Sequence, residues 1–136
     1  MVRIYLFFVF IVMPLLAYNQ ESIDPLMNTI VDSILVEGDH YRKVKKDRKK
    51  AIEVYQVALD YSLDKFGNQS IEFGHSMYRM ALAYSRISYP ESIEYFDKAE
   101  QVYALHGTAY LEQRVKCLYN CCFMKRALGD DDESLE

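Results

Sequence analysis

The chain has few of the residues that reverse or break a backbone. Of its 136 residues, only five are glycine and three are proline. This scarcity excludes a collagen-like or linker-like chain, and it argues against an all-β fold, which needs many tight turns. The three cysteines are too few for a full disulfide framework. The composition therefore favours an all-α domain.

Motifs for catalysis and for metal binding are missing as well. His40, His75 and His106 lie 35 and 31 residues apart, and none has a partner at a metal-ligand spacing such as His-x-x-x-His. The sequence contains no glycine-rich phosphate loop and no nucleophile elbow. We therefore expect a non-catalytic protein that binds no metal and no cofactor.

The first segment has the pattern of a secretory signal peptide. Residues 1–17 read MVRIYLFFVFIVMPLLA, with an early positive charge, an unbroken apolar run and the small residue Ala17 at the cleavage point. The run is shorter than the about 20 residues that span a membrane. We expect residues 1–17 to be a cleaved signal peptide, residues 18–24 a polar linker, and the protein to be periplasmic or secreted. The alternative is an uncleaved signal that anchors the protein through residues 4–17.

The rest of the chain contains an internal sequence repeat. Apolar residues make up 51% of the whole sequence. Similar strings lie 41 and 42 residues apart: Lys50-Ala51-Ile52-Glu53, Glu91-Ser92-Ile93-Glu94 and Glu133-Ser134-Leu135-Glu136. Small and aromatic residues recur at equal intervals in the first two units, as Ala51, Tyr55 and Ala58, and as Ser92, Phe96 and Ala99. Self-similarity at a fixed period predicts a repeated structural unit.

The spacing within each unit is helical, because positions i, i+4 and i+7 share one helix face. We expect the small residues on these faces to be buried where helices meet: Ala51, Ala58, Ala81 and Ala99. The pattern predicts helices at 25–46, 48–65, 70–87, 90–105 and 109–128, with short connections that suit antiparallel pairs. Neither glycine nor proline marks the first turn, which leaves open a less sharply broken helix over residues 25–65.

Two segments carry a family resemblance. Gly38-Asp39-His40-Tyr41 and Met80-Ala81-Leu82-Ala83-Tyr84 each precede a small–aromatic–small set. This arrangement resembles the tetratricopeptide repeat, in the long variety of about 42 residues found in kinesin light chains. The resemblance implies that residues 25–136 form antiparallel helix pairs stacked as an α-solenoid of about 2.5 repeats, the last one incomplete.

The resemblance also implies a concave groove lined by the first helix of each pair. Transferred by alignment, the groove residues are Leu35, Asp39, Arg42, Tyr78, Leu82, Arg86, Tyr119, Phe123 and Arg126. They make an aromatic strip with basic rims, which implies binding of a peptide or a helix from a protein partner. This set differs from the Lys- and Asn-rich clamp that holds chaperone tails in some family members, so we do not expect chaperone-tail binding. The alternative is that Leu82 and Phe123 only fill contacts between repeats.

A basic run precedes the second predicted helix. Seven of nine residues are basic: Arg42, Lys43, Lys45, Lys46, Arg48, Lys49 and Lys50. The run suits a phosphate-rich surface or an acidic partner, and the alternative is a solvated turn. The net charge of −4 and the expected export disfavour nucleic acid.

The cysteines form one cluster, Cys117, Cys121 and Cys122. Helical spacing places the Cβ atoms of Cys117 and Cys121 about 5–6 Å apart, farther than the about 3.5–4.5 Å of a disulfide, and a zinc site would lack two ligands. We expect small buried residues at helix contacts. The alternative is an intermolecular bridge.

The leading prediction for function is an exported protein–protein interaction scaffold. The alternative is the sensory N-terminal part of a longer signalling receptor or regulator whose effector lies beyond residue 136. The third string stops where a second helix would begin, which leaves apolar surface open on the last helix. We expect that the chain is the front piece of a longer protein, or that a partner or a second copy covers this surface.

Overall fold

The computed structural model describes residues 25–133 and confirms the all-α class over that range. Its helices are α2 (Pro25–His40), α3 (Arg48–Phe66), α4 (Ile71–Tyr84), α5 (Tyr89–Leu105) and α6 (Leu111–Glu133). A π-helical turn, Tyr41–Lys45, follows α2, and a 3₁₀ turn, Gly107–Tyr110, precedes α6. The predicted signal peptide, the predicted linker and residues 134–136 lie outside the described residues. No helix within 25–133 is both long enough and apolar enough to cross a membrane.

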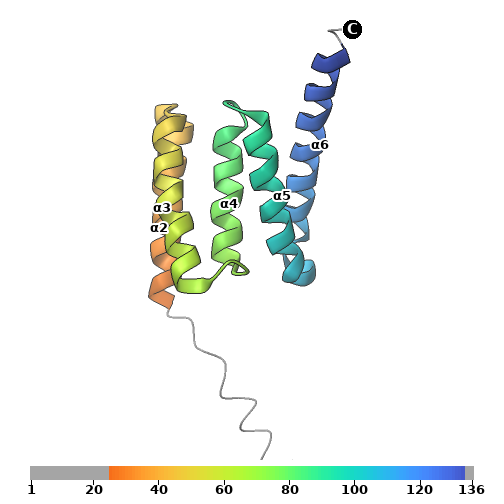
Figure 1. Cartoon of the computed structure of the whole chain (residues 1–136). Helices are drawn as coiled ribbons and strands as arrows, with labels where there is room; N and C mark the ends of the chain where they lie inside the picture. The colour runs from red at the N-terminus through yellow and green to blue at the C-terminus, as the bar shows by residue number, and fades with distance from the viewer. Residues whose placement is uncertain (1–24, 134–136) are drawn as a thin grey trace, which may run out of the picture.

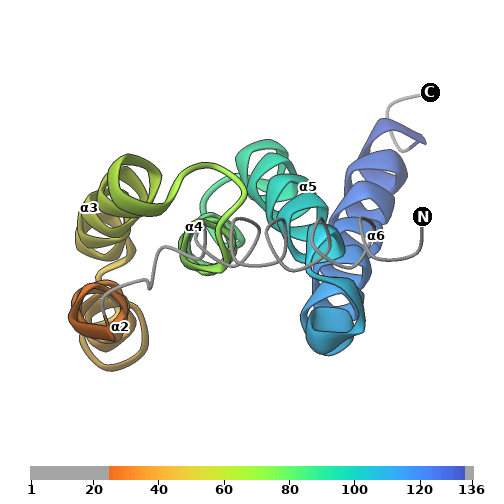
Figure 2. The same cartoon turned by 90° about the horizontal axis from the view of Figure 1, so that it is seen from below.

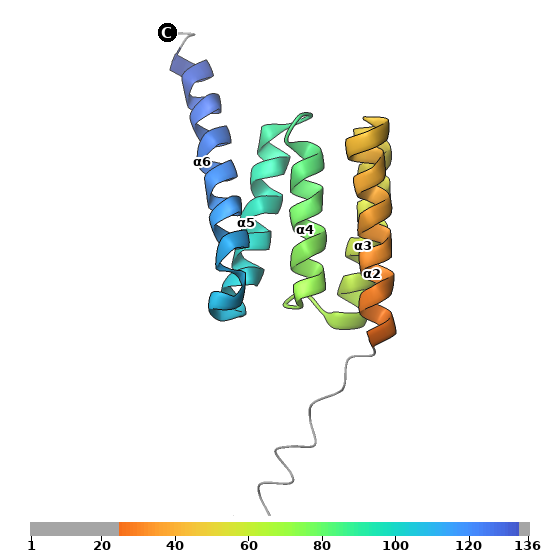
Figure 3. The same ribbon diagram turned by 180° about the vertical axis from the view of Figure 1, so that it is seen from behind.

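The five helices alternate in direction, and each packs against the next along the chain (Figure 1). Helices α2 and α3 form one end of the row and α6 forms the other, as the view from behind also shows (Figure 3). Seen from below, α3 and α5 lie on the same side of α4 (Figure 2). Helix α2 also contacts α4 directly. The chain therefore forms one row of antiparallel helices with α4 at its centre.

The turn between α2 and α3 forms without glycine or proline. Helix α2 ends at His40, earlier than the expected residue 46, and the wider π-helical turn leads to Lys46. Lys46 has φ 57°, in the left-handed region that usually favours glycine. Asp47 then caps α3, because its side chain accepts a hydrogen bond of 3.0 Å from the backbone N–H of Lys50. Residues 25–65 are therefore two antiparallel helices and not one weakly broken helix.

The predicted small and aromatic positions are buried as expected. Ala51, Tyr55 and Ala58 on α3 are 0% exposed, and so are the equivalent residues of α5, Ser92, Phe96 and Ala99. Ala81 on α4 is also 0% exposed. The buried Ser92 hydroxyl has a hydrogen-bond partner, because it donates a 2.8 Å hydrogen bond to the carbonyl oxygen of Ala81. Small side chains at these positions let the helices approach closely.

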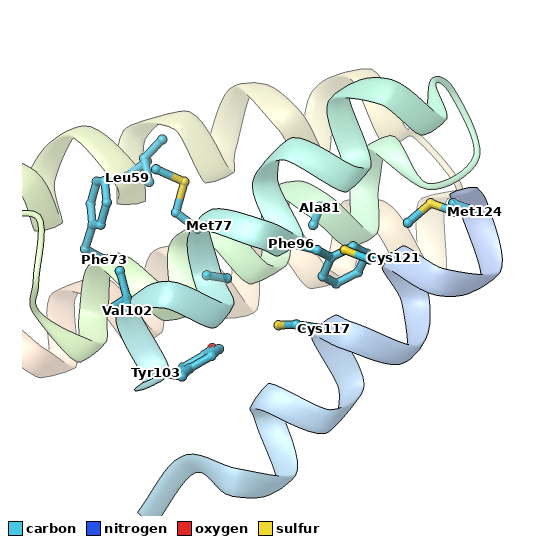
Figure 4. Close-up of a cluster of buried hydrophobic side chains, with 11 residues drawn as sticks. Leu59, Phe73, Met77, Ala81, Phe96, Val102, Tyr103, Cys117, Cys121 and Met124 are labelled. Atoms are coloured by element: carbon cyan, nitrogen blue, oxygen red, sulfur yellow. The ribbon is translucent and has the colours of Figure 1, made fainter. Parts of the chain in front are cut away.

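Two of the three cysteines belong to the apolar core between α4, α5 and α6 (Figure 4). Cys117 and Cys121 are buried beside Phe96 and Met124, whereas Cys122 is exposed. All three are free thiols. The expectation of small buried residues at helix contacts is confirmed for Cys117 and Cys121 and is wrong for Cys122, because Cys122 lies on the face of α6 that points away from α5.

Candidate functional site

A cleft of about 700 Å³ opens along the face that α2, α4 and α6 share. Each of these helices contributes side chains at helical spacing, and Tyr103 of α5 closes the floor. The lining residues are Asp32, Leu35, Val36, Arg42, Lys43, His75, Tyr78, Arg79, Leu82, Tyr103, Gln113 and Lys116. The cleft therefore combines apolar and aromatic surface with charged side chains, which is the composition of many binding sites.

Asp39 organises the cationic side of the cleft. The Tyr55 hydroxyl donates a 2.5 Å hydrogen bond to its carboxylate, and Arg42 donates one of 3.1 Å to the same oxygen. Lys43 lies 3.1 Å and Arg79 3.6 Å from the other carboxylate oxygen. Asp39 thus orients three cations that line the cleft, and it anchors them to α3 through Tyr55.

The pKa values of this network follow from its geometry. Burial acts to raise the pKa of Asp39, but the hydrogen bond from Tyr55, the charge of Arg79 and the hydrogen bonds from Arg42 and Lys43 outweigh it. The pKa of Asp39 is therefore lower than its ordinary value of 3.8. Burial and the hydrogen bond to Asp39 raise the pKa of Tyr55 to about 12. At neutral pH the network therefore holds one carboxylate, a neutral phenol and three cations.

The cleft carries an excess of positive charge. Four of its lining side chains are cationic (Arg42, Lys43, Arg79 and Lys116) and one, Asp32, is a carboxylate. Two further carboxylates pair with these cations, Asp39 with Arg42, Lys43 and Arg79, and Glu112 with Lys116. Four cations and three carboxylates leave one excess positive charge. The Lys43 and Lys116 side chains are more than half exposed, at 57% and 53%, so both reach solvent at the rim. The remaining positive charge, with two of the cations exposed at the rim, favours an anionic group over a cationic one.

The floor of the cleft is aromatic. Nδ1 of His75 lies 2.8 Å from the Tyr103 hydroxyl, and the rings of Tyr103 and Tyr110 stack with centroids 5.6 Å apart. Burial lowers the pKa of His75 from its ordinary value of 6.5, and the charge of Arg79 lowers it further. His75 is therefore neutral at pH 7 and couples α4 to the end of α5.

The structure divides the expected groove residues among three places. Leu35, Arg42, Tyr78 and Leu82 line the cleft, and Leu35 is only 6% exposed because most of it belongs to the core of α2, α3 and α4. A second, smaller cleft of about 330 Å³ is lined by Ser85, Arg86, Tyr89, Asn120, Phe123 and Met124. Tyr119, at 71% exposed, is not among the residues that line either cleft. Arg126 is exposed on α6.

The basic run from Arg42 to Lys50 is partly structural. Arg42 binds Asp39 and Tyr55, and an Nη atom of Arg48 donates a 3.2 Å hydrogen bond to the carbonyl oxygen of Leu82 near the end of α4. A cation is favourable there because helix C-termini carry partial negative charge. All five lysines of the run, by contrast, are exposed: Lys43, Lys45, Lys46, Lys49 and Lys50. The run therefore joins α2, α3 and α4 as well as presenting charge to solvent.

The two buried cysteine thiols of the described residues are poorly reactive. Burial, followed by the charge of nearby groups, raises the pKa of Cys117 to about 12, and burial with a hydrogen bond to Asp97 raises that of Cys121 to about 12. Neither thiol is a thiolate at neutral pH, so neither is an activated nucleophile. Within residues 25–133 no group of three or more His, Cys, Asp or Glu side chains could hold a metal ion.

Eight lining residues were not among the expected groove residues: Asp32, Val36, Lys43, His75, Arg79, Tyr103, Gln113 and Lys116. A signal for His75 and Arg79 exists in the sequence, because they lie three residues before Tyr78 and three before Leu82 on the same helix. Gln113 and Lys116 depend on the angle at which α6 meets α5, which no local pattern encodes.

The chain was compared with protein-family models, with curated proteins and with solved structures, and none of them matches it.

Proposed function

We propose that the chain is a non-catalytic protein-binding scaffold of the tetratricopeptide type, and that the cleft between α2, α4 and α6 binds an acidic segment of a protein partner. The observation that carries this proposal is the grouping of Arg42, Lys43, Arg79 and Lys116 around an apolar and aromatic floor. A peptide with carboxylates and one apolar anchor matches both parts of the surface. Aromatic and Arg side chains are also those that most often dominate binding energy.

The repeat character of the proposal is supported by the equivalent positions in α3 and α5. Tyr55 and Phe96 lie at the same place in the repeated pattern and are both fully buried, each between small residues of its own helix. The antiparallel row of helices is the geometry from which an α-solenoid is built. A concave face lined by alternate helices is then the expected binding surface of such a stack.

A peptide selection on the full chain tests the binding function. Peptides enriched from a random displayed library should be acidic with an apolar or aromatic anchor. Their affinity should fall about tenfold or more in the double variant Lys43→Glu and Lys116→Glu, because two rim charges change sign. The affinity should also fall as salt is raised, since both lysines are exposed and screened.

The matched control is the double variant Lys65→Glu and Lys98→Glu. Both lysines are exposed, at 43% and 49%, each pairs with one carboxylate, and neither lines the cleft. The control has the same net charge as the test variant and should bind like the original chain. Equal weakening in both double variants, or enrichment of basic peptides, would contradict the proposal.

The export part of the proposal rests on residues 1–17, which lie outside the described residues. Their charge, apolar run and small final residue support a signal peptide. N-terminal sequencing of the mature protein tests it, and the expected start lies close to Tyr18. A cytosolic chain that still begins at Met1 would overturn export.

A further inference from the structure

The outer face of α6 carries an apolar stripe that no other helix of the described chain covers. Leu111, Val115, Leu118 and Cys122 lie at i, i+4, i+7 and i+11, which is one face of the helix. The first three are 53%, 56% and 48% exposed. A different face of α6, about 120° around the helix, holds Cys117, Cys121 and Met124 against α5 and is buried. Helix α6 therefore has two apolar faces, of which one is open.

The open face repeats the face that α4 presents to α5. Three residues of this face have counterparts 41 positions earlier on α4: Val115 corresponds to Gly74, Leu118 to Met77 and Cys122 to Ala81. Those three residues of α4 are buried. Val102 of α5 lies against Gly74, and Ser92 of α5 bonds the Ala81 carbonyl. Figure 4 shows Ala81 beside the ring of Phe96. The residues of α6 in this register are thus apolar but uncovered.

The face of α2 that α3 covers shows the same packing, in which a small residue of one helix contacts a larger side chain of the next. Gly38 lies directly against the ring of Tyr55, an aromatic residue of α3 between Ala51 and Ala58. In both pairs the small residue of the first helix, Gly38 or Ala81, receives an aromatic ring from the second helix. On α6 the residue at this position is Cys122, which is small and exposed.

We propose that the outer face of α6 binds an antiparallel amphipathic helix of another polypeptide, carrying a small residue, an aromatic residue four positions later and a small residue three positions after that. The aromatic ring would pack over Cys122, and the small residues would let the backbones approach. A folded second copy does not offer such a helix, because the faces with this pattern on α3 and α5 are 0% exposed.

The charges beside the stripe favour the antiparallel direction. Lys125, 58% exposed, flanks its C-terminal end and pairs with Asp97 of α5 at 3.6 Å. Glu112, 74% exposed, flanks its N-terminal end and pairs with Lys116 on the same helix. An antiparallel helix places its first turns beside Lys125 and its last turns beside Glu112. Acidic residues early in the partner and basic residues late are therefore complementary. Helix α5 has this order itself, with Glu91 and Glu94 before Lys98.

The probe is a fluorescent synthetic peptide with the α5 sequence, residues 89–105, titrated into the full chain. We expect saturable binding that is at least about tenfold weaker in Leu118→Asp, because a charge would be buried in the contact. Lys125→Glu should weaken binding severalfold. The matched control is Val57→Asp on α3, where a valine is 56% exposed, and it should bind like the original chain. A peptide with Phe96→Ala should lose binding. Circular dichroism verifies that each variant folds.

Alkylation of Cys122 gives a readout at the site itself. Cys117 and Cys121 are buried, so Cys122 is the described thiol that reacts in the folded chain. Saturating peptide should slow its alkylation about tenfold. Binding that survives Leu118→Asp, or that leaves Cys122 alkylation unchanged, would overturn the proposal. Sedimentation showing a dimer that Leu118→Asp converts to a monomer, without peptide binding, would assign the face to a second copy and also overturn it.

Discussion

The ring of Tyr55 fills the space that a side chain on Gly38 would need. A Cβ atom on Gly38 would overlap Cε1 of Tyr55, far inside van der Waals contact. The hydroxyl of the same ring reaches Asp39, the next residue of α2. The contact between Gly38 and Tyr55 thus sets how closely α2 approaches α3, and it places Asp39 where it can organise the cations of the cleft.

Gly38→Ala should therefore destabilise the protein, although alanine favours a helix by about 1 kcal/mol. We expect a net loss of about 1–3 kcal/mol in the free energy of unfolding, because the ring must move. Urea denaturation followed by circular dichroism measures it. The control is Gly129→Ala on α6, where an added Cβ meets nothing within 4 Å. This control should be neutral or slightly stabilising, and a Gly38→Ala variant as stable as the control would contradict the close contact.

Ala58→Leu and Ala99→Leu should each cost about 1–3 kcal/mol of unfolding free energy through overpacking. Both alanines are 0% exposed between neighbouring helices. Ala104→Leu provides the control, because Ala104 lies on α5 but is exposed, and its effect should stay within about 0.5 kcal/mol. Thermal melts of the three variants compare their stability with that of the original chain. Neutral melts for both buried sites would argue against the repeat register.

His75 should make the stability depend on pH. The unfolded imidazole binds a proton near its ordinary pKa of 6.5, whereas burial and Arg79 keep the folded one neutral to lower pH. The stabilising contribution of neutral His75 is therefore present above pH 6.5 and is lost as the pH falls through the lower folded pKa. We expect the free energy of unfolding to decrease from about pH 7.5 to about pH 5.5.

In His75→Gln this decrease should be shallower, since the titrating group is gone. His40→Gln is the control, because His40 is exposed, and it should keep the original slope. Urea denaturation at a series of pH values compares the three chains. Identical slopes for the original chain and His75→Gln would show that His75 does not carry the effect.

Arg48→Met should lower the free energy of unfolding by about 1 kcal/mol, because Leu82 loses a charged hydrogen-bond donor at the end of α4. Lys49→Met, the adjacent and exposed position, should change it by less than about 0.5 kcal/mol. The same urea titration measures both variants. If Arg48→Met is as neutral as Lys49→Met, the basic run is a solvated turn and not a structural link.

Local patterns in the sequence were sufficient for the helices and for much of the core. The intervals among Ala51, Tyr55 and Ala58 predicted a buried face, and the same intervals after Ser92 predicted a second one. Such predictions succeed because helical periodicity alone decides which side chains share a face. The sequence did not predict the end of α2 at His40, because Lys46 adopts a left-handed conformation that is unusual for lysine.

The site depended on contacts between helices that are distant in the sequence. Periodicity places Cys121 and Cys122 next to each other, but only the packing of α6 on α5 buries the first and exposes the second. Likewise, the sequence shows the basic run itself, but only the structure shows that Arg42 binds Asp39 and Tyr55. Only the structure shows, too, that Arg48 binds the carbonyl oxygen of Leu82.

The sequence by itself determined the all-α class, the approximate helices and their small–aromatic faces, because these follow from local spacing. The tertiary structure alone decided which charges surround the cleft and which face of α6 stays open. The physical reason is that helix crossing angles and separations arise from side-chain packing across the whole row, as where Gly38 admits the ring of Tyr55.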